Sequence, residues 1–467
     1  MSHCPETLPE ASVSKNFCAH QLNDISVNQA RSILSIPNTD SILVLERGES
    51  AVSLLKDTNG DTYPDKRFII AEAPGLNHGL ALHGNYLYAT SSTTVYRWTF
   101  NSDATTSSGD RTIVITGMNA DGKGGAPNGH RTRTIIFDEV GRLYISIGSA
   151  GNVDRDSYRS RIRRFDISDQ TSYPIDFTTG EVFADGLRNE VGLSFDSSNI
   201  LWGVENGADN LYRSDLGGDI HNDNPGEELN RFPESNKGKT YGYPYCWSEY
   251  LLPKYGKGPG TVWAWPNIKH DNVLTTDDWC RKNSVPSELS MQAHSAPLGM
   301  SFYKWKESYI TNQCKGSFPK EFDGYAFIAF HGSWNHDPST GYKVVYVPIS
   351  DGRVKGDPVD LLVHTGATRE WGDGMRPVDV DFDQCGRLLI SSDGTKPNYN
   401  KGSKVIIMSF DDVDKQRETY GGCCGKESKG PTHSKSNGRK LSITMSGNIW
   451  TIMFALLLFF FVSHQRR

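Results

Sequence analysis

The stretch Phe137-Asp138-Glu139-Val140-Gly141-Arg142-Leu143-Tyr144-Ile145-Ser146 returns later in the chain as Phe382-Asp383-Gln384-Cys385-Gly386-Arg387-Leu388-Leu389-Ile390-Ser391. Weaker copies occur at residues 36–45, 82–89 and 195–203. Each copy is the end of one strand, a polar turn and an alternating apolar strand, which is the pattern of a β-hairpin. Hairpins that recur at intervals of several tens of residues predict a β-propeller, in which each blade is one antiparallel sheet. In such a ring, we expect the chemistry in the loops around the central axis.

The composition agrees with an all-β chain. The 467 residues include 46 Gly, 20 Tyr and 10 Trp, which suits short strands joined by many turns. The net charge of −6 and the lack of a basic block within the repeats argue against nucleic acid as a partner. The chain also lacks a Rossmann glycine signature, a P-loop and an HExxH motif, which argues against the nucleotide and zinc chemistry of those motifs.

The ends of the chain differ from the repeats. We divide the sequence into a lead-in segment (1–25), the propeller (26–412), a Ser/Gly/Lys-rich stalk predicted to be disordered (413–440) and a hydrophobic segment (441–467). The apolar run at 449–462 is shorter than the ~20 residues of a spanning helix. Small residues at 436–438 followed by a spacer and an apolar tail are similar to a GPI signal, whereas the closing Arg466-Arg467 favours a spanning helix. Both alternatives predict a protein attached to a membrane through its C-terminus.

Eight cysteines are spread widely along the chain: Cys4, Cys18, Cys246, Cys280, Cys314, Cys385, Cys423 and Cys424. Their even number favours disulfides and an oxidising compartment, with scattered buried thiols as the alternative. Cys246 and Cys280 flank one long loop, and we expect this pair to be bridged. The cysteines favour an extracellular face for the anchored protein. No signal peptide is visible, so a tail anchor facing the cytosol stays open.

One turn has the oxygen spacing of a cation-binding loop. Asp57, Asn59, Asp61 and Asp65 stand at loop positions 1, 3, 5 and 9. Ca²⁺ needs several oxygens converging at about 2.4 Å, and this spacing supplies them. The glutamate of an EF-hand is replaced by Phe68 at position 12. The stretch therefore predicts either a weak calcium loop or an ordinary Asp/Asn/Gly turn.

Polar groups stand beside several repeat strands. His130 precedes the strand at 134–137, Arg188 precedes the strand at 192–195, and Arg376 opens the last clear strand. The oxygen-rich stretch 205–210 follows another strand. Propeller pockets are built from such positions, because each blade contributes one or two residues at the axis. A histidine there is a candidate general base, although a surface or capping histidine is the more common reading of an isolated one.

Eight motifs in order carry a resemblance to a known family. They are Gly186-Leu187-Arg188-Asn189, Glu205-Asn206-Gly207, Glu228-Leu229-Asn230, Tyr241-Gly242-Tyr243-Pro244-Tyr245-Cys246, His294-Ser295-Ala296-Pro297-Leu298-Gly299-Met300, His331-Gly332-Ser333-Trp334-Asn335, Gly341-Tyr342-Lys343-Val344-Val345 and Arg376-Pro377-Val378. The string resembles the sorbosone/pyranose dehydrogenase family, relatives of soluble quinoprotein glucose dehydrogenase, over roughly residues 17–410. The resemblance implies a six-bladed propeller that binds pyrroloquinoline quinone (PQQ) and Ca²⁺ at its axial mouth.

The resemblance also implies roles for individual residues. His130 matches the base that takes the sugar hydroxyl proton, and Arg188 matches the arginine beside the quinone oxygen. Arg31 and Arg376 match cofactor-binding arginines, whose planar guanidinium binds carboxylates bidentately. The carbonyls of Gly207 and Ala208 match calcium ligands. His294, His331 and Trp334 match further pocket motifs that we expect to bind the cofactor.

One departure concerns the base. The glucose dehydrogenase branch has an aspartate that orients the histidine, and the matching segment here, 147–152, has none. Asp154 or Asp156 could replace it from nearby. Without such a carboxylate the imidazole loses control of its tautomer, and the rate of proton abstraction could suffer.

These observations predict an enzyme that oxidises a sugar or sugar-like alcohol or aldehyde and delivers electrons to an external acceptor. The alternative is a membrane-tethered binding module without catalysis, resembling Hedgehog-interacting protein. A calcium-dependent lactone hydrolase is a third reading. The retention of Arg31, His130, Arg188 and Arg376 together favours the enzyme, because a scaffold has no need of four such groups at one mouth.

Overall fold

The computed structural model describes residues 8–106, 109–118, 129–155, 159–168, 172–311, 315–366, 370–395 and 399–411. The chain divides into two compact units, Met1–Asp414 and Lys415–Arg467. The second unit, the stalk and the hydrophobic segment lie outside the described residues. Within the described residues, no helix has the length and apolar character needed to cross a bilayer.

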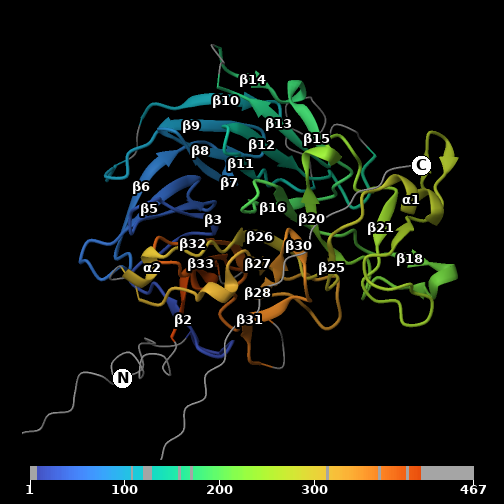
Figure 1. The fold of residues 1–467 in the computed structure, drawn as a ribbon. Coiled ribbons are helices and arrows are strands. Elements are labelled where there is room, and N and C mark those ends of the chain that lie inside the picture. Colours follow the sequence, from blue (N-terminus) through green and yellow to red (C-terminus); the bar gives the residue numbers. More distant parts are fainter. Residues whose placement is uncertain are drawn as a thin grey trace, which may run out of the picture. The chain divides into compact units, whose positions relative to one another are not determined.

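Over the described ranges, six sheets of four or five strands surround one axis, as Figure 1 shows. Blade 1 is β3 (Ala30–Ser35), β4 (Ile42–Glu46), β5 (Ala51–Lys56) and β6 (Lys66–Glu72). Blade 2 is β7 (Leu76–His83), β8 (Tyr86–Ser91), β9 (Val95–Thr99), β10 (Thr112–Thr116) and β14 (Ile175–Asp176). Blade 3 is β11 (Ile135–Phe137), β12 (Arg142–Ile147), β13 (Arg161–Asp166) and β15 (Glu181–Asp185).

The other three blades follow in chain order. Blade 4 is β16 (Glu190–Phe195), β17 (Leu201–Glu205), β20 (Glu227–Phe232) and β25 (Leu289–Met291). Blade 5 is β26 (Pro297–Phe302), β27 (Ala326–Phe330), β28 (Lys343–Val347), β31 (Val359–His364) and β1 (Ala11–Val13). Blade 6 is β32 (Pro377–Phe382), β33 (Leu388–Asp393), β34 (Ser403–Phe410) and β2 (Phe17–Gln21). The prediction of a six-bladed all-β propeller is confirmed.

The repeated sequence is the turn between the first two strands of a blade. In blade 3, Asp138 accepts hydrogen bonds from the main-chain N–H groups of Val140 and Arg142 and from the Arg142 guanidinium. In blade 6, Asp383 makes the same bonds with Cys385 and Arg387. The glycine of each copy has a positive φ, +86° at Gly141 and +72° at Gly386. The repeat is therefore an aspartate-capped turn whose shape needs glycine at that place.

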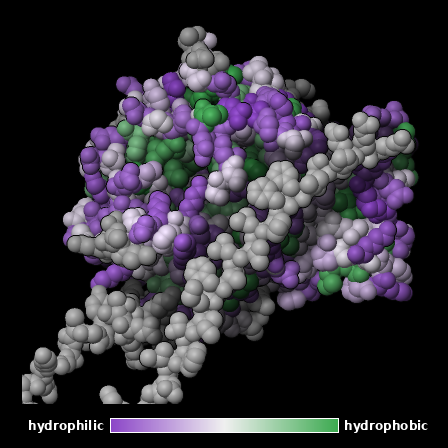
Figure 2. All heavy atoms as spheres, in the orientation of Figure 1, coloured by the Kyte–Doolittle hydropathy of each residue, from purple (hydrophilic) through white to green (hydrophobic). Residues whose placement is uncertain are grey.

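Each neighbouring pair of blades is joined by an apolar core. Blades 1 and 2 share one cluster that includes Leu45 and Trp98, and the cluster between blades 5 and 6 includes Phe327 and Ile390. Four further clusters join the remaining pairs, including blade 6 to blade 1. Burial of these strands between sheets closes the ring. Hydrophilic residues cover most of the face seen in Figure 2, where apolar residues form only small groups.

The N-terminal segment is part of the propeller. Residues 1–25 were expected to lead into the ring, but β1 pairs with β31 in blade 5 and β2 pairs with β34 in blade 6. Both are outer strands, whose apolar residues complete the blades. The sequence repeat does not reveal β1 and β2, because each of these two strands lies far along the chain from the other strands of its blade.

The innermost strands are β3, β7, β11, β16, β26 and β32, which gather around the centre of Figure 1. All six line an axial cavity of about 220 Å³. Side chains also join the last blade to the first: Asp379 of β32 accepts from the Ile33 N–H, and Asp381 accepts from the Ser35 N–H. The axial cavity is therefore lined by both apolar and polar side chains, and these hydrogen bonds help to join blade 6 to blade 1.

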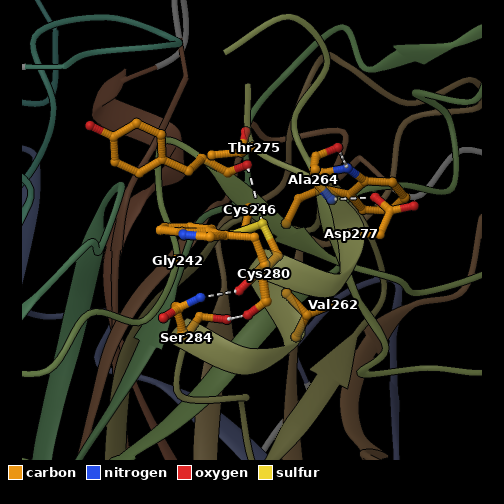
Figure 3. The surroundings of a disulfide bond; sticks show 12 residues. Gly242, Cys246, Val262, Ala264, Thr275, Asp277, Cys280 and Ser284 are labelled. Atoms are coloured by element: carbon orange, nitrogen blue, oxygen red, sulfur yellow. Dashed lines mark hydrogen bonds between the residues drawn. A yellow bond between two sulfur atoms is a disulfide. The ribbon is translucent and has the colours of Figure 1, made fainter. Parts of the chain in front are cut away.

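Two loops of blade 4, between β17 and β20 and between β20 and β25, form a small lobe of short elements. These are β18 (Tyr212–Arg213), β19 (Gly218–Asp219), β21 (Cys246–Ser248), β22 (Val262–Ala264), β23 (Lys269–His270), β24 (Val273–Leu274) and α1 (Asp277–Asn283). The expected bridge between Cys246 and Cys280 is confirmed, and Figure 3 shows its surroundings. Asp277 beside it accepts a hydrogen bond from the Ala264 N–H. Minor elements elsewhere are β29 (Ile349–Ser350), β30 (Arg353–Val354), α2 (Ser308–Thr311) and α3 (Tyr399–Gly402).

Candidate functional site at the axial mouth

Polar residues gather at one end of the axis, and the direction of the strands explains why. Consecutive strands of a blade run in opposite directions. The inner strand of each blade begins, and the second strand ends, at the same end of the ring. We call this end the mouth. The polar residues that stand near these strand ends are Arg31, His130, Ser149, Arg188, Asp209, His294, His331, Arg376 and Asp393.

One side of the mouth is organised by Asp393, at the end of β33. Its Oδ2 lies 2.8 Å from Nη1 of Arg31, and its Oδ1 lies 2.8 Å from Nε2 of His331. Burial disfavours the carboxylate, but the hydrogen-bonded ring of His331 and the Arg31 guanidinium hold the pKa of Asp393 well below its usual range. The other guanidinium nitrogen of Arg31, Nη2, lies 3.2 Å from Nδ1 of His78. Four blades thus contribute to one buried network.

The opposite side of the mouth repeats this arrangement around Asp209. Its Oδ2 lies 2.8 Å from Nη2 of Arg188, and its Oδ1 lies 3.7 Å from Nδ1 of His294. Burial lowers the pKa of His294, so its ring is neutral near pH 7. The mouth therefore carries two groups of Arg, Asp and His, each contributed by more than one blade.

Arg376 differs from the other two arginines. Its guanidinium donates only to main-chain carbonyls, those of His331 at 2.9 Å and Gly332. Among the described residues, no carboxylate forms an ion pair with it. In addition, the buried Nε of Arg31 has no hydrogen-bond partner there. This side of the mouth consequently has spare positive charge and spare donors, which fit the carboxylates of a planar anion.

His130 is positioned by the segment after β12. Its Nδ1 lies 3.2 Å from the carbonyl oxygen and 3.0 Å from the hydroxyl of Ser149. Burial, together with the charge of Arg188, lowers the pKa of His130 to about 3. A neutral imidazole whose Nδ1 is engaged in this way leaves Nε2 to accept a proton.

Of the two expected substitutes for an orienting aspartate, only Asp154 lies within the described residues. Asp154 accepts from the Ala150 N–H and from the Arg159 guanidinium. Asp156 lies outside the described residues. Ser149 takes the place beside His130, and no sequence signal identified a main-chain acceptor.

The oxygens around Arg188 form a donor set suited to a hard cation. Its guanidinium is held by the carbonyls of Asn206, Gly207 and Asn152, the amide oxygen of Asn152 and the carboxylate of Asp209. Carbonyl and carboxylate oxygens are the ligands that Ca²⁺ prefers, and here they already converge on one positive charge. No group of three or more His, Cys, Asp or Glu side chains in the described residues has a metal-binding arrangement, because most of these donors are main-chain atoms. The Gly207 carbonyl lies among these oxygens, the buried Ala208 directly follows it, and their role as calcium ligands stays a prediction.

The other predicted calcium loop lies at the opposite end of its blade. Glu46 and Ala51 pair at the mouth end of β4 and β5, so residues 57–65, after β5, are at the far end. Arg387, in the turn before β33, reaches this loop and donates to the Thr62 carbonyl. The Asp57, Asn59 and Asp61 oxygens accept main-chain N–H groups of the loop, and Asp65 accepts from Thr58. These contacts are those of an Asx-type turn, and the structure does not bring the loop to the site.

Trp334 is also set apart from the buried cluster. It follows His331 on the loop after β27, and its side chain is 74% exposed. Sequence reasoning missed His78 and Asp393, whereas Asp209 lies in the oxygen-rich stretch 205–210 but was given no role of its own. Asp393 has a signal, because it ends the apolar strand of the second repeat copy. His78 has none, since it lies within an ordinary-looking strand.

Known proteins resemble this chain in sequence and in fold. The chain matches the TrAA12-like family over residues 11–399. A pyrroloquinoline quinone-dependent sugar dehydrogenase of Hypocrea jecorina (strain QM6a) is 32% identical over 428 residues, covering 86% of this chain and 90% of that protein. The calcium structure of a Trichoderma reesei carbohydrate-active enzyme of family AA12 has a TM-score of 0.70 at 29% identity, covering 87% of this chain and 98% of that one. The holo form of the pyranose dehydrogenase PQQ domain from Coprinopsis cinerea has a TM-score of 0.71 at 26% identity, covering 87% and 99%.

Proposed function

Because the chain belongs to the TrAA12-like family, we propose that it is a PQQ-dependent dehydrogenase that oxidises a sugar or sugar-like alcohol or aldehyde, with Ca²⁺ at the cofactor. The observation that carries the proposal is the mouth itself. Three arginines from three blades and a neutral, oriented histidine share one end of the axis. Two of the relatives described above are named as dehydrogenases and the third as a carbohydrate-active enzyme, so the alternative of a non-catalytic propeller gains no support.

The residues divide the task between binding and proton transfer. Arg31 and Arg376 would bind cofactor carboxylates, because Arg376 lacks an acidic partner and Arg31 retains a free donor. Arg188 would stand beside the quinone oxygen, where positive charge stabilises the developing oxyanion. His130 would take the hydroxyl proton at Nε2 while the substrate carbon loses its hydride. When bound, PQQ supplies the quinone that accepts this hydride, and Ca²⁺ supplies a Lewis acid.

The calcium part of the proposal rests on the donor set around Arg188. Gly207, Asn206 and Asp209 present oxygens toward the same point. A cation there would compete with the guanidinium for these oxygens, and Ala208 would add its carbonyl. The loop at 57–65 remains a candidate for a second, weaker cation at the other end of the ring.

The decisive experiment is reconstitution of the purified chain. The protein, freed of metal with a chelator, receives PQQ, Ca²⁺ or both, and then a panel of aldoses with a dye as the external electron acceptor. We expect dye reduction only when both are added, and Arg376→Ala should need more PQQ for the same rate. A broad sugar panel without dye reduction, together with no PQQ binding by fluorescence, would contradict the proposed function.

We further propose that the protein is held at the extracellular face of a membrane by its C-terminal hydrophobic segment. The support is the apolar run at 449–462, which lies outside the described residues, and the disulfide between Cys246 and Cys280. Release from intact cells by a phosphatidylinositol-specific phospholipase would indicate a GPI anchor. Retention after this treatment, with extraction only by detergent, would indicate a spanning segment, and recovery in the aqueous fraction would contradict both.

A further inference from the structure

Glu227 is a buried carboxylate that neither the motifs nor the reaction chemistry brought into the site. It is the first residue of β20, beneath the mouth, and Glu227 is 2% exposed. Oε2 accepts a hydrogen bond from the Gly207 N–H at 2.6 Å, and Oε1 accepts one from the Ala296 N–H at 2.9 Å. One side chain therefore links the loop after β17 in blade 4 to the turn before β26 in blade 5.

These two hydrogen bonds fix the direction of two carbonyl groups. In a trans peptide unit the C=O and the N–H point in opposite directions. Because the Gly207 N–H points inward to Glu227, the Asn206 carbonyl of the same unit points outward, where it accepts from Arg188 Nη1 at 3.2 Å. In the same way, the Ala296 N–H points to Glu227, and the Ser295 carbonyl accepts from the Gly332 N–H at 3.0 Å.

Each of the two segments carries site groups. The first includes Gly207, whose carbonyl oxygen lies 2.6 Å from Nη1 of Arg188. The second includes His294, and its Ala296 carbonyl accepts from the His331 N–H at 2.9 Å. Both His294 and Ala296 have positive φ, +56° and +55°, a conformation that such residues rarely adopt without support from their surroundings. Glu227 provides support at the Ser295–Ala296 peptide.

We infer that Glu227 is a positioning residue for the cofactor site, which turns the Asn206 carbonyl toward the cation and holds the Gly207 loop and the His294–Ala296 turn at the same mouth. The inference rests on the proposed function, because the cation and quinone are those of the previous subsection. A buried carboxylate is costly unless its oxygens are hydrogen-bonded, and both oxygens of Glu227 accept a main-chain N–H. In Glu227→Gln one of the two oxygens becomes an NH₂ group. This group donates and cannot accept from a backbone N–H, so one of the two hydrogen bonds would be lost.

The test compares Glu227→Gln with Glu249→Gln in the cofactor-free protein. Glu249 is a matched control, since it is also 2% exposed and accepts N–H groups, from Lys257, Gly258 and the Trp263 ring, but within the blade 4 lobe. Calcium chloride binding is measured by calorimetry, and PQQ binding by fluorescence in the presence of calcium. We expect Glu227→Gln to weaken both about tenfold or more and Glu249→Gln to change neither by more than about twofold. Equal losses in the two variants, or none in Glu227→Gln, would overturn the inference.

A second measurement keeps the inference testable if Glu227→Gln does not fold. Hydrogen exchange of the wild-type chain, without ligands, reports directly on the Gly207 and Ala296 amides. We expect both to exchange at least about tenfold more slowly than amides of exposed loops, and Glu227→Asp, whose shorter side chain cannot reach both, to lose protection at one of them. Fast exchange at both amides in the wild type would overturn the inference. A wild-type chain that protects these amides but binds neither calcium nor PQQ would instead overturn the proposed function alone.

Discussion

At the scale of single residues, His130 obtains its orientation from a main-chain carbonyl. A carbonyl oxygen only accepts, so the Ser149 contact places the ring proton on Nδ1 and leaves the lone pair on Nε2. The Ser149 hydroxyl donates to the Gly151 carbonyl, which fixes the hydroxyl as a second acceptor facing the ring. The segment 147–152 has no aspartate that could fix the tautomer of His130. The carbonyl and hydroxyl of Ser149 fix it instead.

Replacement of His130 is expected to lower the rate of the reaction without changing the binding of the cofactor. We expect His130→Ala to lower turnover by about 10²-fold or more, because the hydroxyl proton loses its acceptor, while PQQ binding stays near the wild-type value. Ser149→Ala is the matched control, since it removes the hydroxyl and keeps the orienting carbonyl, and it should lower turnover less than about tenfold. Stopped-flow reduction with a saturating aldose measures both. Unchanged turnover in His130→Ala would show that another group is the base.

The pH dependence follows from the lowered pKa. A base must be neutral to act, and a histidine whose pKa is lowered to about 3 stays neutral down to that pH. We therefore expect the rate of the reductive step to show no loss with an ordinary histidine pKa near 6.5 as the pH falls from 8 to 5. A single protonation near pH 6.5 that abolishes this step, and that disappears in His130→Gln, would contradict the assignment.

We expect the replacement of Arg376 and the replacement of Arg31 to have different effects on the free energy of unfolding. Arg376 has no acidic partner among the described residues, so Arg376→Ala leaves no buried charge behind and should change the free energy of unfolding by less than about 1 kcal/mol. Arg31→Ala leaves the buried Asp393 with only the more distant and partly exposed guanidinium of Arg47, at 3.6 Å, and should destabilise the protein by about 2 kcal/mol or more. Urea unfolding of the two variants checks the difference. Both should weaken PQQ binding, and equal stability of the two would contradict this account.

At the scale of elements, the blade 4 lobe depends on its disulfide more than the blades do. Each strand of its hairpins is two or three residues long, and the bond joins cysteines 34 residues apart. Chain-entropy reasoning gives a loop of that length about 3–4 kcal/mol of stabilisation. Because Cys18 and Cys385 are disulfide-bonded as well, reductant would not isolate this effect.

The double variant Cys246→Ser/Cys280→Ser is therefore the appropriate test. We expect limited proteolysis to cut first within residues 246–283, while the far-ultraviolet signal of the blade sheets is kept. The wild type under the same non-reducing conditions is the control. Cleavage that begins in the blades, or resistance equal to that of the wild type, would contradict a local role for the bond.

At the scale of the whole molecule, the ring is closed by pairing of β2 with β34 and by carboxylates that join β32 to β3 at the axis. Burial raises the pKa of Asp379 to about 7, although it accepts main-chain N–H groups of Ile33 and Val380. A carboxyl group whose pKa is higher in the folded state than in the unfolded state stabilises the fold at low pH. This contribution is complete below about pH 4 and is lost as the pH rises through 7.

Asp379→Asn should remove this pH dependence. Relative to the variant, the wild type is expected to lose roughly 2–4 kcal/mol of unfolding free energy between pH 4 and pH 7. Asp381→Asn, at a site whose pKa is raised to about 6, should show a smaller effect over a lower range. Urea unfolding at several pH values measures both. A difference between wild type and Asp379→Asn that does not vary with pH would contradict the buried titration.

The propeller could be predicted from the sequence because its turns are local. The carboxylates of Asp138 and Asp383 bond to groups no more than four residues away, apart from a Tyr144 hydroxyl, so the same ten-residue pattern gives the same hairpin wherever it occurs. The arginines and histidine of the site were visible for a related reason, since they stand beside strands of that repeat. The resemblance to a family named their roles, which the pattern alone does not.

Other features depend on contacts that only the closed ring creates. Arg31 and Asp393 are 362 residues apart, and β2 completes a blade whose other strands begin at Pro377, so no local pattern could pair them. The arrangement of the blades in the ring also decides which end of each strand faces the mouth. For this reason the oxygen-rich loop at 57–65 lies away from the site, whereas Gly207 lies within it. Local hydrogen bonds made the blades readable from the chain, whereas the charge pairing at the mouth was decided by how six blades meet around one axis.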